Sequence, residues 1–452
     1  MKRIIDHFLL QWKQNSYRKP LLLRGARQVG KTFSVRQLGK TYADFVEINL
    51  ESAPDIVAVF EKDLDPRRIL RELSLIARKS ITPGTTLLFL DEIQLVPRAI
   101  TALRYFYEIV PELHVIAAGS LLDFAIEQVG IPVGRVESLY MHPVSFIEFL
   151  AAVGNTMIVD EILNHDISQE MSPVIHDKIL GLLGEYLALG GMPQSVQHWL
   201  EKKDALGCAK AHATLLDTYR QDFGKYAKKL QIKYVELLFK YVPIQMGRKF
   251  KYSAIEGDYR KRELAPALDL LETAGIAHKI FYSAGQGIPL GAQIDPQDYK
   301  IIFLDAGLAQ TALGLDVAGW FLQPEREFVN KGALVEAFVG QELLAYASPH
   351  IKQELYYWHK ESGAAGQAEV DYLVQLAGTV VPLEVKSGSG RTLKSMQTFL
   401  ETHPKSSYGL RCSIQNYSLY ENIHSYPLYA LAKIMSDSNA EMKQAIHYLA
   451  ST

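Results

Sequence analysis

Residues 25–32 read GARQVGKT and match the pattern G-x-x-x-x-G-K-[ST] of a phosphate-binding loop. The loop follows an apolar run at 21–23, as it would where a buried strand leads into it. In such a loop, backbone N–H groups surround the phosphates, Lys31 supplies a charge for the β- and γ-phosphates, and the Thr32 hydroxyl can bind Mg²⁺. The sequence therefore predicts a nucleoside triphosphate site. Its binding residues are Gly25, Ala26, Arg27, Gln28, Val29, Gly30, Lys31 and Thr32.

A second element of the same site lies about sixty residues after Lys31. The stretch TTLLFLDEIQ (85–94) is an apolar strand pattern that contains Asp91 and Glu92 at its end. Its order and spacing are typical of a Walker B strand, in which Asp91 would hold Mg²⁺ through water and Glu92 would polarise the attacking water. Taken alone, the two acids could also be the acidic cap of a following helix. Together with the loop, they favour a site that binds and hydrolyses MgATP.

A third strand pattern, HVIAAGS (114–120), ends in Ser120, which would face the γ-phosphate from an adjacent strand unless it only caps a helix. The stretches GARQVGKT, LLFLDEIQ, VIAAGS and, at 134–150, GRVESLYMHPVSFIEFL resemble a prokaryotic branch of the AAA+ ATPases. The resemblance spans most of the chain. It implies an ATPase with ATP and Mg²⁺ as cofactors, places Ser120 at the sensor-1 position, and couples the ATPase module to a C-terminal region.

Two arginines are candidates to touch the γ-phosphate, within the chain or from a neighbouring subunit of a homo-oligomer. Arg135 lies in the stretch VGRV, and Arg104 lies in the helix expected after the Walker B strand. We favour Arg135; the alternative is a structural ion pair, because most surface arginines are only solvated. Arg24 and Arg27 are expected to act through local electrostatics.

Length and composition indicate a soluble globular protein of several domains. The 452 residues are too many for one hydrophobic core, and the net charge of −2 gives no overall signal for nucleic acid. Cys208 and Cys412 are far apart and lack the spacing of zinc ligands, so a reducing cytoplasm is the expected location. The N-terminal apolar residues have helical spacing instead of a signal-peptide pattern, and no apolar run is long enough to span a membrane.

The first 150 or so residues alternate apolar runs with helical patterns, which predicts a parallel sheet covered by helices. The expected strands are residues 20–24, 45–49, 86–90 and 114–118. We expect an α/β fold with a P-loop AAA+ core at 1–157, a helical lid at 158–219, a winged-helix-like basic domain at 220–310 and a small α/β domain at 311–452. In the third domain, residues 251–280 have the pattern of a short helix, a polar connector, a helix at 263–273 and an apolar strand, which is the order of a winged helix-turn-helix.

The segment 220–262 carries twelve Lys or Arg residues against four acids, a net charge of +8. Such a charge can attract a phosphate backbone, and aromatic residues among the charges could stack on bases. These are Tyr226, Tyr234, Tyr241, Phe250, Tyr252 and Tyr259. The sequence thus predicts DNA as a partner of this segment and of the C-terminal domain. The alternatives are a helix that buries its aromatic stripe and exposes its lysines, or a winged helix that docks a protein partner.

Two strand patterns near the C-terminus, at 369–371 (EVD) and 383–386 (LEVK), bring acidic residues together. A hairpin that turns on residues 377–378 sets Asp371 directly opposite Glu384 on one face of the sheet. Opposed residues have Cβ atoms about 4.5–5.5 Å apart, so the two carboxylates would repel unless a cation such as Mg²⁺ bridges them. A bulge would shift this pairing.

This arrangement resembles the PD-(D/E)xK nuclease family, and the resemblance implies a restriction-endonuclease-like fold for the last domain. It makes Asp371 and Glu384 metal ligands and Lys386 the residue that orients the nucleophile or steadies the phosphate. Glu336, on the preceding helix, matches the family's helical acid, whereas Val370 stands where the name-giving pattern has proline.

The same register also allows a site without chemistry, because it sets Glu369 opposite Lys386 as a cross-strand ion pair. The leading hypothesis is an ATPase switch that acts on DNA through a nuclease-like domain. A rival hypothesis keeps the ATPase and makes the C-terminal domain an inactive platform that docks a protein partner. A third is a nucleotide-gated, antitoxin-like regulatory module with negligible turnover.

Overall fold

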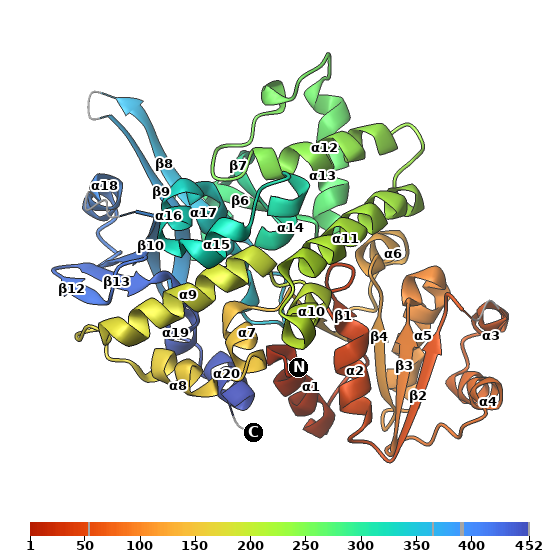
Figure 1. Ribbon diagram of the computed structural model, residues 1–452. Coiled ribbons are helices and arrows are strands. Elements are labelled where there is room, and N and C mark those ends of the chain that lie inside the picture. Colours follow the sequence, from red (N-terminus) through yellow and green to blue (C-terminus); the bar gives the residue numbers. More distant parts are fainter. Residues whose placement is uncertain (53–54, 364–365, 389–392, 451–452) are drawn as a thin grey trace.

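The computed structural model describes residues 1–52, 55–363, 366–388 and 393–450. Within these residues the chain folds around two β-sheets, one of five strands and one of eight, with helices between and around them (Figure 1). The fold is therefore mixed α/β, as the sequence predicts. In the described part of the chain, no helix combines the length and the apolarity needed to cross a bilayer.

The first sheet is parallel and is built from the apolar runs of the first 150 residues. Its strands are β1 (Leu21–Arg24), β2 (Asp44–Asn49), β3 (Thr86–Asp91), β4 (His114–Ala118) and β5 (Glu137–Tyr140). They lie in the order β2-β3-β4-β1-β5, and each neighbouring pair is parallel. The four predicted strands are confirmed to within one residue at each end. Because β3 and β4 are buried along their whole length, their uninterrupted apolar runs belong to central strands.

Helices cover both faces of this sheet, because alternate side chains of each strand point to opposite sides. On one face, Leu88 and Leu90 pack in a core with α3 to α6; on the other, Leu87 and Phe89 pack with α1 and α2. These helices are α1 (Ile4–Gln14), α2 (Lys31–Gly39), α3 (Ile56–Lys62), α4 (Pro66–Ala77), α5 (Pro97–Ile109) and α6 (Leu122–Val129).

A series of helices leads from this sheet to the second one (Figure 1). They are α7 (Phe146–Ala152), α8 (Thr156–Asn164), α9 (Pro173–Leu189), α10 (Pro193–Lys202), α11 (Ala205–Tyr226), α12 (Ile232–Ile244) and α13 (Lys261–Thr273). Gly190 ends α9 with a positive φ of 67°, and Pro193 is the first residue of α10. The glycine-proline stretch at 190–193 is thus a turn between two helices, as its composition indicates.

The second sheet combines the hairpin after α13 with the strands of the C-terminal region. Its strands are β6 (Ala277–Ser283), β7 (Ile294–Phe303), β8 (Leu355–Gly363), β9 (Gly366–Leu376), β10 (Thr379–Lys386), β11 (Gly409–Ser413), β12 (Ser418–Tyr420) and β13 (Ile423–Pro427). The order is β12-β13-β11-β10-β9-β8-β6-β7. Since β6 pairs with β8, one sheet continues across position 310, where the sequence predicts a domain boundary.

The remaining helices surround this second sheet and return the chain to its beginning. They are α14 (Ala306–Ala312), α15 (Ala318–Leu322), α16 (Pro324–Asn330), α17 (Gly332–Ala345), α18 (Lys394–Thr402), α19 (Leu431–Asp437) and α20 (Ala440–Ala450). Helix α20 contacts α1, so the two ends of the described chain lie close together (Figure 1). One hydrophobic core runs from the first sheet through these helices to the second sheet.

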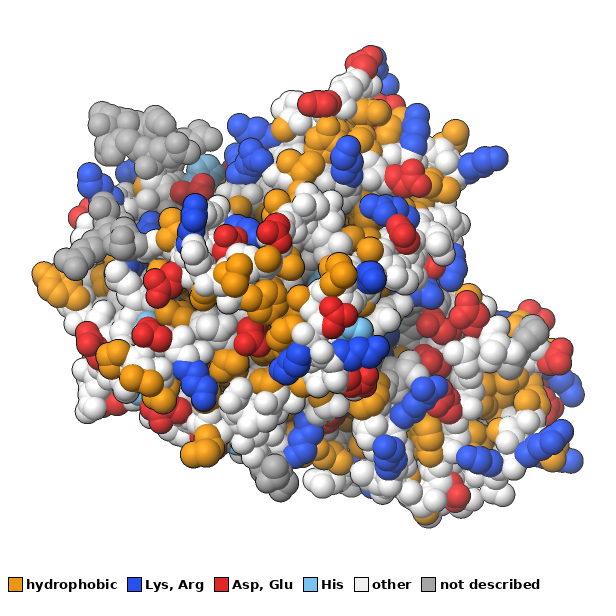
Figure 2. All heavy atoms as spheres, in the orientation of Figure 1, with side chains coloured by type: hydrophobic (Ala, Val, Ile, Leu, Met, Phe, Trp, Pro, Cys, Tyr) orange, Lys and Arg blue, Asp and Glu red, His pale blue; other side chains and the backbone are white. Residues whose placement is uncertain are grey.

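The basic segment 220–262 forms the end of α11, all of α12 and the start of α13. Figure 2 shows Lys and Arg side chains over this part of the molecule, interspersed with acidic and hydrophobic ones. Among the six aromatic residues considered for stacking on bases, only Tyr259 is exposed; Phe250 is buried and the other four are partly buried. Tyr226 stacks on Phe124 with ring centroids 4.5 Å apart, and the Tyr234 hydroxyl donates to Glu263. Most of these rings therefore support the fold and are not free to stack on bases.

Candidate functional site

The phosphate-binding loop connects β1 to α2, which begins at Lys31. Gly25 has a φ of 141°, and a Cβ atom there would lie 2.2 Å from the Met141 carbonyl oxygen, so the position requires glycine. Gln28 and Gly30 also have positive φ angles, 62° and 106°. The loop thus makes several tight turns immediately before a helix N-terminus, which is the arrangement that binds phosphate.

Lys31 is buried beneath this loop. Its Nζ donates to the carbonyl oxygens of Gly25 at 2.7 Å and Ala26 at 2.8 Å. Burial lowers the Lys31 pKa to about 8, although the carboxylates of Glu92 and Asp91 act in the opposite direction. A pKa of about 8 keeps the side chain mostly charged at neutral pH. Because its present partners are neutral carbonyls, this charge is available for an anionic ligand.

Thr32 and Asp91 meet across the end of the first sheet. The Thr32 hydroxyl donates to Asp91 Oδ2 at 3.0 Å, and Asp91 is the buried last residue of β3. Burial, reinforced by the neighbouring Glu92, raises the Asp91 pKa. A hydroxyl and a carboxylate in contact beside the loop are the oxygen ligands that hold Mg²⁺ in P-loop enzymes, so the residues present fit this ion.

Glu92 follows Asp91 in an unusual backbone conformation. Its φ of 54° and ψ of 42° lie in the left-handed region, which costs free energy for a residue with a side chain. Its side chain accepts a hydrogen bond from Gln94 Nε2 at 2.5 Å, and Gln94 belongs to the short 3-10 helix η1 (Ile93–Leu95). Gln94 in turn packs on Gly119, where a Cβ atom would lie 1.8 Å from Gln94 Oε1. The fold thus holds the Glu92 carboxylate in a set position.

A cavity of about 400 Å³ adjoins the Glu92 side chain. Glu92, Gln94 and Ser120 line it, and Arg27 and Lys225 line it as well. Ser120 follows β4, and it also lines a second, smaller cavity together with Gly25 and Ala26. The structure therefore brings together the loop, the Walker B acid Glu92 and Ser120, as the sequence predicts.

The two arginines considered for the γ-phosphate have a shared acidic partner instead. Arg104 Nε lies 3.0 Å from Glu108 Oε1, and Arg135 Nε lies 3.2 Å from the same oxygen. Both side chains are about half exposed, and neither lines the cavity beside Glu92. Arg24, at the end of β1, forms an ion pair with Asp123. A phosphate contact by Arg135 stays a prediction, whereas Arg27 is the arginine that lines the cavity.

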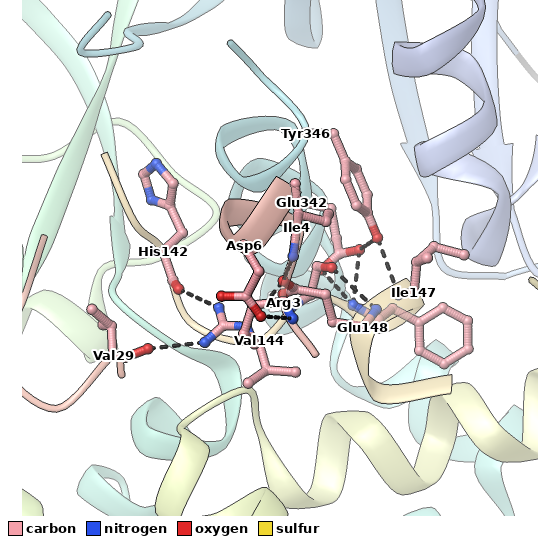
Figure 3. Close-up of polar contacts among 12 residues, drawn as sticks. Arg3, Ile4, Asp6, Val29, His142, Val144, Ile147, Glu148, Glu342 and Tyr346 are labelled. Carbon is pink, nitrogen blue, oxygen red and sulfur yellow. Dashed lines mark hydrogen bonds and ion pairs between the residues drawn. The ribbon is translucent and has the colours of Figure 1, made fainter. Parts of the chain in front are cut away.

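A buried polar network fixes the loop from the other side (Figure 3). Arg3 donates from Nη1 to the Val29 carbonyl oxygen at 2.9 Å and from Nη2 to the His142 carbonyl oxygen at 2.8 Å. Its Nε pairs with Glu148 Oε1 at 2.9 Å. The Glu148 carboxylate also accepts from the backbone N–H of Ser145 at 2.8 Å, so it caps α7. The loop is thereby tied to α1 and α7.

Glu342 extends this network into the C-terminal half of the chain (Figure 3). It lies on α17, and its carboxylate accepts from the Phe146 N–H at 3.1 Å and from the Tyr346 hydroxyl. Burial raises the Glu342 pKa to about 8. Sequence patterns do not predict these contacts, because residues 146 and 342 are far apart along the chain.

The C-terminal hairpin has the predicted register. Strands β9 and β10 pair from Thr379 with Leu376 to Leu383 with Tyr372, and the turn residues 377 and 378 both have positive φ. Beyond the last backbone pair, Asp371 Oδ2 accepts from the Val385 N–H at 2.8 Å. The Asp371 side chain therefore contacts the backbone of β10 at the residue that follows Glu384.

A buried lysine from β7, Lys300, joins the C-terminal acids. Its Nζ lies 2.9 Å from Glu336 Oε1, 2.5 Å from Glu369 Oε1 and 3.6 Å from Asp371 Oδ1, and the side chain has no exposed surface. Burial alone would lower the Lys300 pKa, but these carboxylates outweigh it and raise the pKa above its ordinary value. We call the following six residues the acid–lysine cluster: Lys300, Glu336, Glu369, Asp371, Glu384 and Lys386.

The ion pairs inside the cluster differ from the alternative arrangement, in which Glu369 pairs with Lys386. Lys386 Nζ pairs with Glu384 Oε1 at 2.6 Å, and Glu369 pairs with Lys300. Burial and the nearby Asp371 raise the Glu384 pKa to about 6. Its second oxygen, Oε2, is buried without a hydrogen-bond partner. Among the fully buried side-chain oxygens and nitrogens of the cluster, within the described residues, it is the one without such a partner.

Metal binding in the cluster was predicted for Glu336, Asp371 and Glu384 together. Among the described residues, no three Asp, Glu, His or Cys side chains are grouped so that they could hold one metal ion. Glu336 is turned toward Lys300, whose ammonium group supplies the positive charge at that point. The structure thus does not bring these three acids together as one metal-binding group, and only Asp371 and Glu384 remain as an adjacent pair.

Comparisons with known proteins address the first part of the chain most clearly. Residues 17–150 match the family model of an AAA domain. The chain therefore carries an AAA-type ATPase domain. Residues 180–318 match a domain of unknown function (DUF8612), and residues 331–431 match another (DUF4143).

A solved structure described as a Walker-type ATPase of Pyrococcus abyssi is also similar to this chain. It is 15% identical, the match covers 69% of this chain and 95% of that chain, and the TM-score is 0.45. No curated protein matches this chain.

Proposed function

We propose that this protein binds and hydrolyses MgATP at the end of its first sheet and uses the nucleotide state to control its C-terminal half. The contact of 3.0 Å between the Thr32 hydroxyl and the Asp91 carboxylate is the observation that carries the proposal. It joins the phosphate-binding loop to the Walker B strand, beside the charge of Lys31 and the carboxylate of Glu92. The AAA-type domain at residues 17–150 supports the same reaction class.

Each residue has a defined task in this reaction. Lys31 leaves the loop carbonyls and neutralises the β- and γ-phosphates. Thr32 and Asp91 would hold Mg²⁺, which when bound neutralises charge on the phosphate oxygens. Glu92 accepts a hydrogen bond from the attacking water and takes its proton as general base. Gln94 positions the Glu92 carboxylate through its amide, and Ser120 offers a hydroxyl to the γ-phosphate.

Replacing the predicted Mg²⁺ residue tests this assignment. Asp91→Asn keeps the size of the side chain and can still bond to Thr32, but it removes the charge that holds the ion. We expect hydrolysis to fall at least about a hundredfold while the circular dichroism spectrum stays unchanged. Glu354→Gln, on the exposed surface, is the control. Unchanged hydrolysis in Asp91→Asn would remove the Walker B strand from the mechanism.

DNA is the proposed target of the second half of the chain. The net charge of +8 over residues 220–262 supports this proposal. The sequence of α12, α13 and the β6–β7 hairpin is compatible with the proposed winged helix. Lys251, Lys261 and Arg262 are exposed in this segment. Lys249 is a poorer candidate, because its Nζ pairs with Asp298 at 2.5 Å.

Charge reversal separates this proposal from a protein-docking role. We expect the triple variant of Lys251, Lys261 and Arg262 to glutamate to lose most of its DNA affinity, and wild-type affinity to fall steeply with salt. A matched triple variant on α9 to α11 carries glutamate at the exposed positions Lys178, Lys202 and Lys210. Equal affinities in both triple variants would favour a face that docks a protein partner.

A second candidate function is metal-dependent cleavage of a phosphodiester at Asp371, Glu384 and Lys386. The open Glu384 Oε2 beside Asp371 favours it, because a cation there would be bound by the two acids that β9 and β10 hold together. Lys386, 2.6 Å from Glu384, would then contact the phosphate or the nucleophile. Only these two acids are proposed to bind the cation, because Lys300 already neutralises Glu336 and Glu369.

The cleavage hypothesis is tested with linear and supercoiled DNA in the presence of Mg²⁺ or Mn²⁺, with and without ATP. Asp371→Asn and Lys386→Ala should abolish cutting, and Glu401→Ala, on the exposed side of α18, should not. Equal cutting by all variants would indicate contamination. Absence of cutting by the wild type, with intact DNA binding, would favour the inactive docking platform.

A further inference from the structure

Two cations at the mouth of the proposed ATPase site share one buried acid. Arg27, the third residue of the phosphate-binding loop, lies with Nη1 2.6 Å from Asp222 Oδ2. Lys225 lies with Nζ 3.1 Å from Asp222 Oδ1. Asp222 is on α11 and its side chain is only 7% exposed, whereas the Lys225 side chain is 46% exposed. The two cations therefore carry more positive charge than their common partner can neutralise.

The position of these cations relates them to the γ-phosphate. Both line the cavity that Glu92 and Ser120 also line. Glu92 is the proposed base for the water that attacks the γ-phosphorus, so a cation that faces this cavity faces the terminal phosphate of a bound nucleotide. The Tyr219 hydroxyl donates to the Arg27 carbonyl oxygen at 2.8 Å, which fixes α11 against the loop at this point.

We propose that Arg27 and Lys225 bind the γ-phosphate of ATP by exchanging Asp222 for it, and that this exchange makes the site distinguish ATP from ADP. The inference rests on the proposed ATPase function. ATP offers a terminal phosphate with a charge near −2, which attracts the two cations more strongly than one carboxylate does. ADP offers no group at this place, so the cations stay with Asp222.

The chemistry of the side chains suits this exchange. The guanidinium of Arg27 can form two parallel hydrogen bonds to phosphate oxygens, and Lys225 is a point charge on a flexible stem that can follow the phosphate. Within the described residues, Lys225 has one further acidic partner, Glu51, at 3.8 Å, and the Glu51 side chain is 58% exposed and well screened by solvent. Asp222 is the competitor that holds both cations until the triphosphate arrives.

Nucleotide affinities of matched variants test the proposal. Titration calorimetry with a non-hydrolysable ATP analogue and with ADP is applied to Arg27→Gln, Lys225→Gln and the wild type. Each variant should bind the ATP analogue about tenfold more weakly, because a charge-assisted hydrogen bond is lost, and should bind ADP within about twofold of the wild type. Arg67→Gln and Lys228→Gln remove exposed charges elsewhere and should change neither affinity.

Asp222→Asn should change the affinity for the ATP analogue in the opposite direction. It removes the competing charge and keeps the shape, so affinity for the ATP analogue should rise severalfold while ADP affinity stays constant. Thermal unfolding of each variant confirms that the fold is retained. In the doubly substituted protein Asp222→Asn/Arg27→Gln, most of this gain should disappear, since one of the released cations is missing.

Three outcomes would overturn the inference. Equal losses for the ATP analogue and ADP in Arg27→Gln and Lys225→Gln would make both residues general supports of the loop. Unchanged affinity in both would exclude a phosphate contact, and a selective loss in Arg135→Gln would assign that contact to Arg135. A wild-type protein that binds neither nucleotide contradicts the proposed ATPase function itself, which distinguishes that failure from the other three.

Discussion

The phosphate-binding loop and the acid–lysine cluster each contain a buried lysine, but the two lysines have different partners. Lys31 is held by two neutral carbonyl oxygens, those of Gly25 and Ala26. Lys300 is held by the carboxylates of Glu336 and Glu369, and lies near a third, Asp371. The charge of Lys31 is therefore free for an anionic ligand, whereas that of Lys300 is neutralised within the fold. A buried lysine marks a binding site only where its own chain has not already neutralised it.

Replacing the buried lysine with methionine in each region should give the largest difference between the two regions. Lys300→Met leaves three partly buried carboxylates, those of Glu336, Glu369 and Asp371, without their cation, so we expect the free energy of unfolding to fall by about 3–5 kcal/mol. Lys31→Met removes no ion pair with any residue that the structure describes, so it should leave that free energy nearly unchanged but lower ATP affinity about a hundredfold. Urea denaturation and calorimetric titration measure the two effects. Similar losses of stability in both variants would contradict the distinction drawn between the lysines.

A backbone test addresses the loop alone. Gly25→Ala would place a Cβ atom 2.2 Å from the Met141 carbonyl oxygen at a φ of 141°. We expect about 1–3 kcal/mol of destabilisation and a loss of ATP binding, because the loop must move to relieve the clash. Gly224→Ala, on α11, has open space around it and should be neutral or slightly stabilising. If Gly25→Ala binds ATP normally, the loop tolerates another path.

The network between the two regions should show a pH dependence. Burial raises the Glu342 pKa to about 8 from an ordinary value of 4.5, so the folded state binds more protons than the unfolded state between these values. Stability from this group is fully present below pH 4.5 and is lost as the pH rises through about 8. Glu342→Gln should flatten the decline in denaturation midpoint between pH 5 and pH 9.

Glu325→Gln, an exposed acid on α16, is the matched control for this pH series and should decline as the wild type does. An unchanged slope in Glu342→Gln would show that another buried group causes the dependence.

The smallest effect is expected at the exposed arginines. Glu108 binds both Arg104 and Arg135 on the surface of α5. Because exposed ion pairs contribute little, Glu108→Gln should change ATP affinity and the hydrolysis rate by no more than about twofold. Nucleotide titration and a phosphate-release assay measure both. A larger change in ATP affinity or hydrolysis rate would indicate that Arg135 contacts the nucleotide.

Local patterns in the sequence are sufficient for the first region. The strand ending at Asp91 and the turn at Gly25 are continuous stretches whose apolar period and glycine positions follow from backbone geometry. For the same reason the register of the β9–β10 hairpin is predictable, because a two-residue turn fixes which residues pair.

The contacts that the sequence does not predict join residues that are far apart along the chain. Lys300 reaches Glu336 and Glu369 from a strand that was assigned to another domain, and no local pattern marks it. Arg3 reaches Val29 and Glu148 in the same way. Such contacts depend on how whole elements pack, and a pattern read along the chain contains no information about which elements become neighbours.

The central claim is that the first region hydrolyses ATP with Glu92 as base. The most direct test is steady-state phosphate release from MgATP by the wild type and by Glu92→Gln, with ATP binding measured in parallel. We expect Glu92→Gln to bind ATP within about threefold of the wild type and to release phosphate at least about a hundredfold more slowly. Equal phosphate release by the two proteins would contradict the claim.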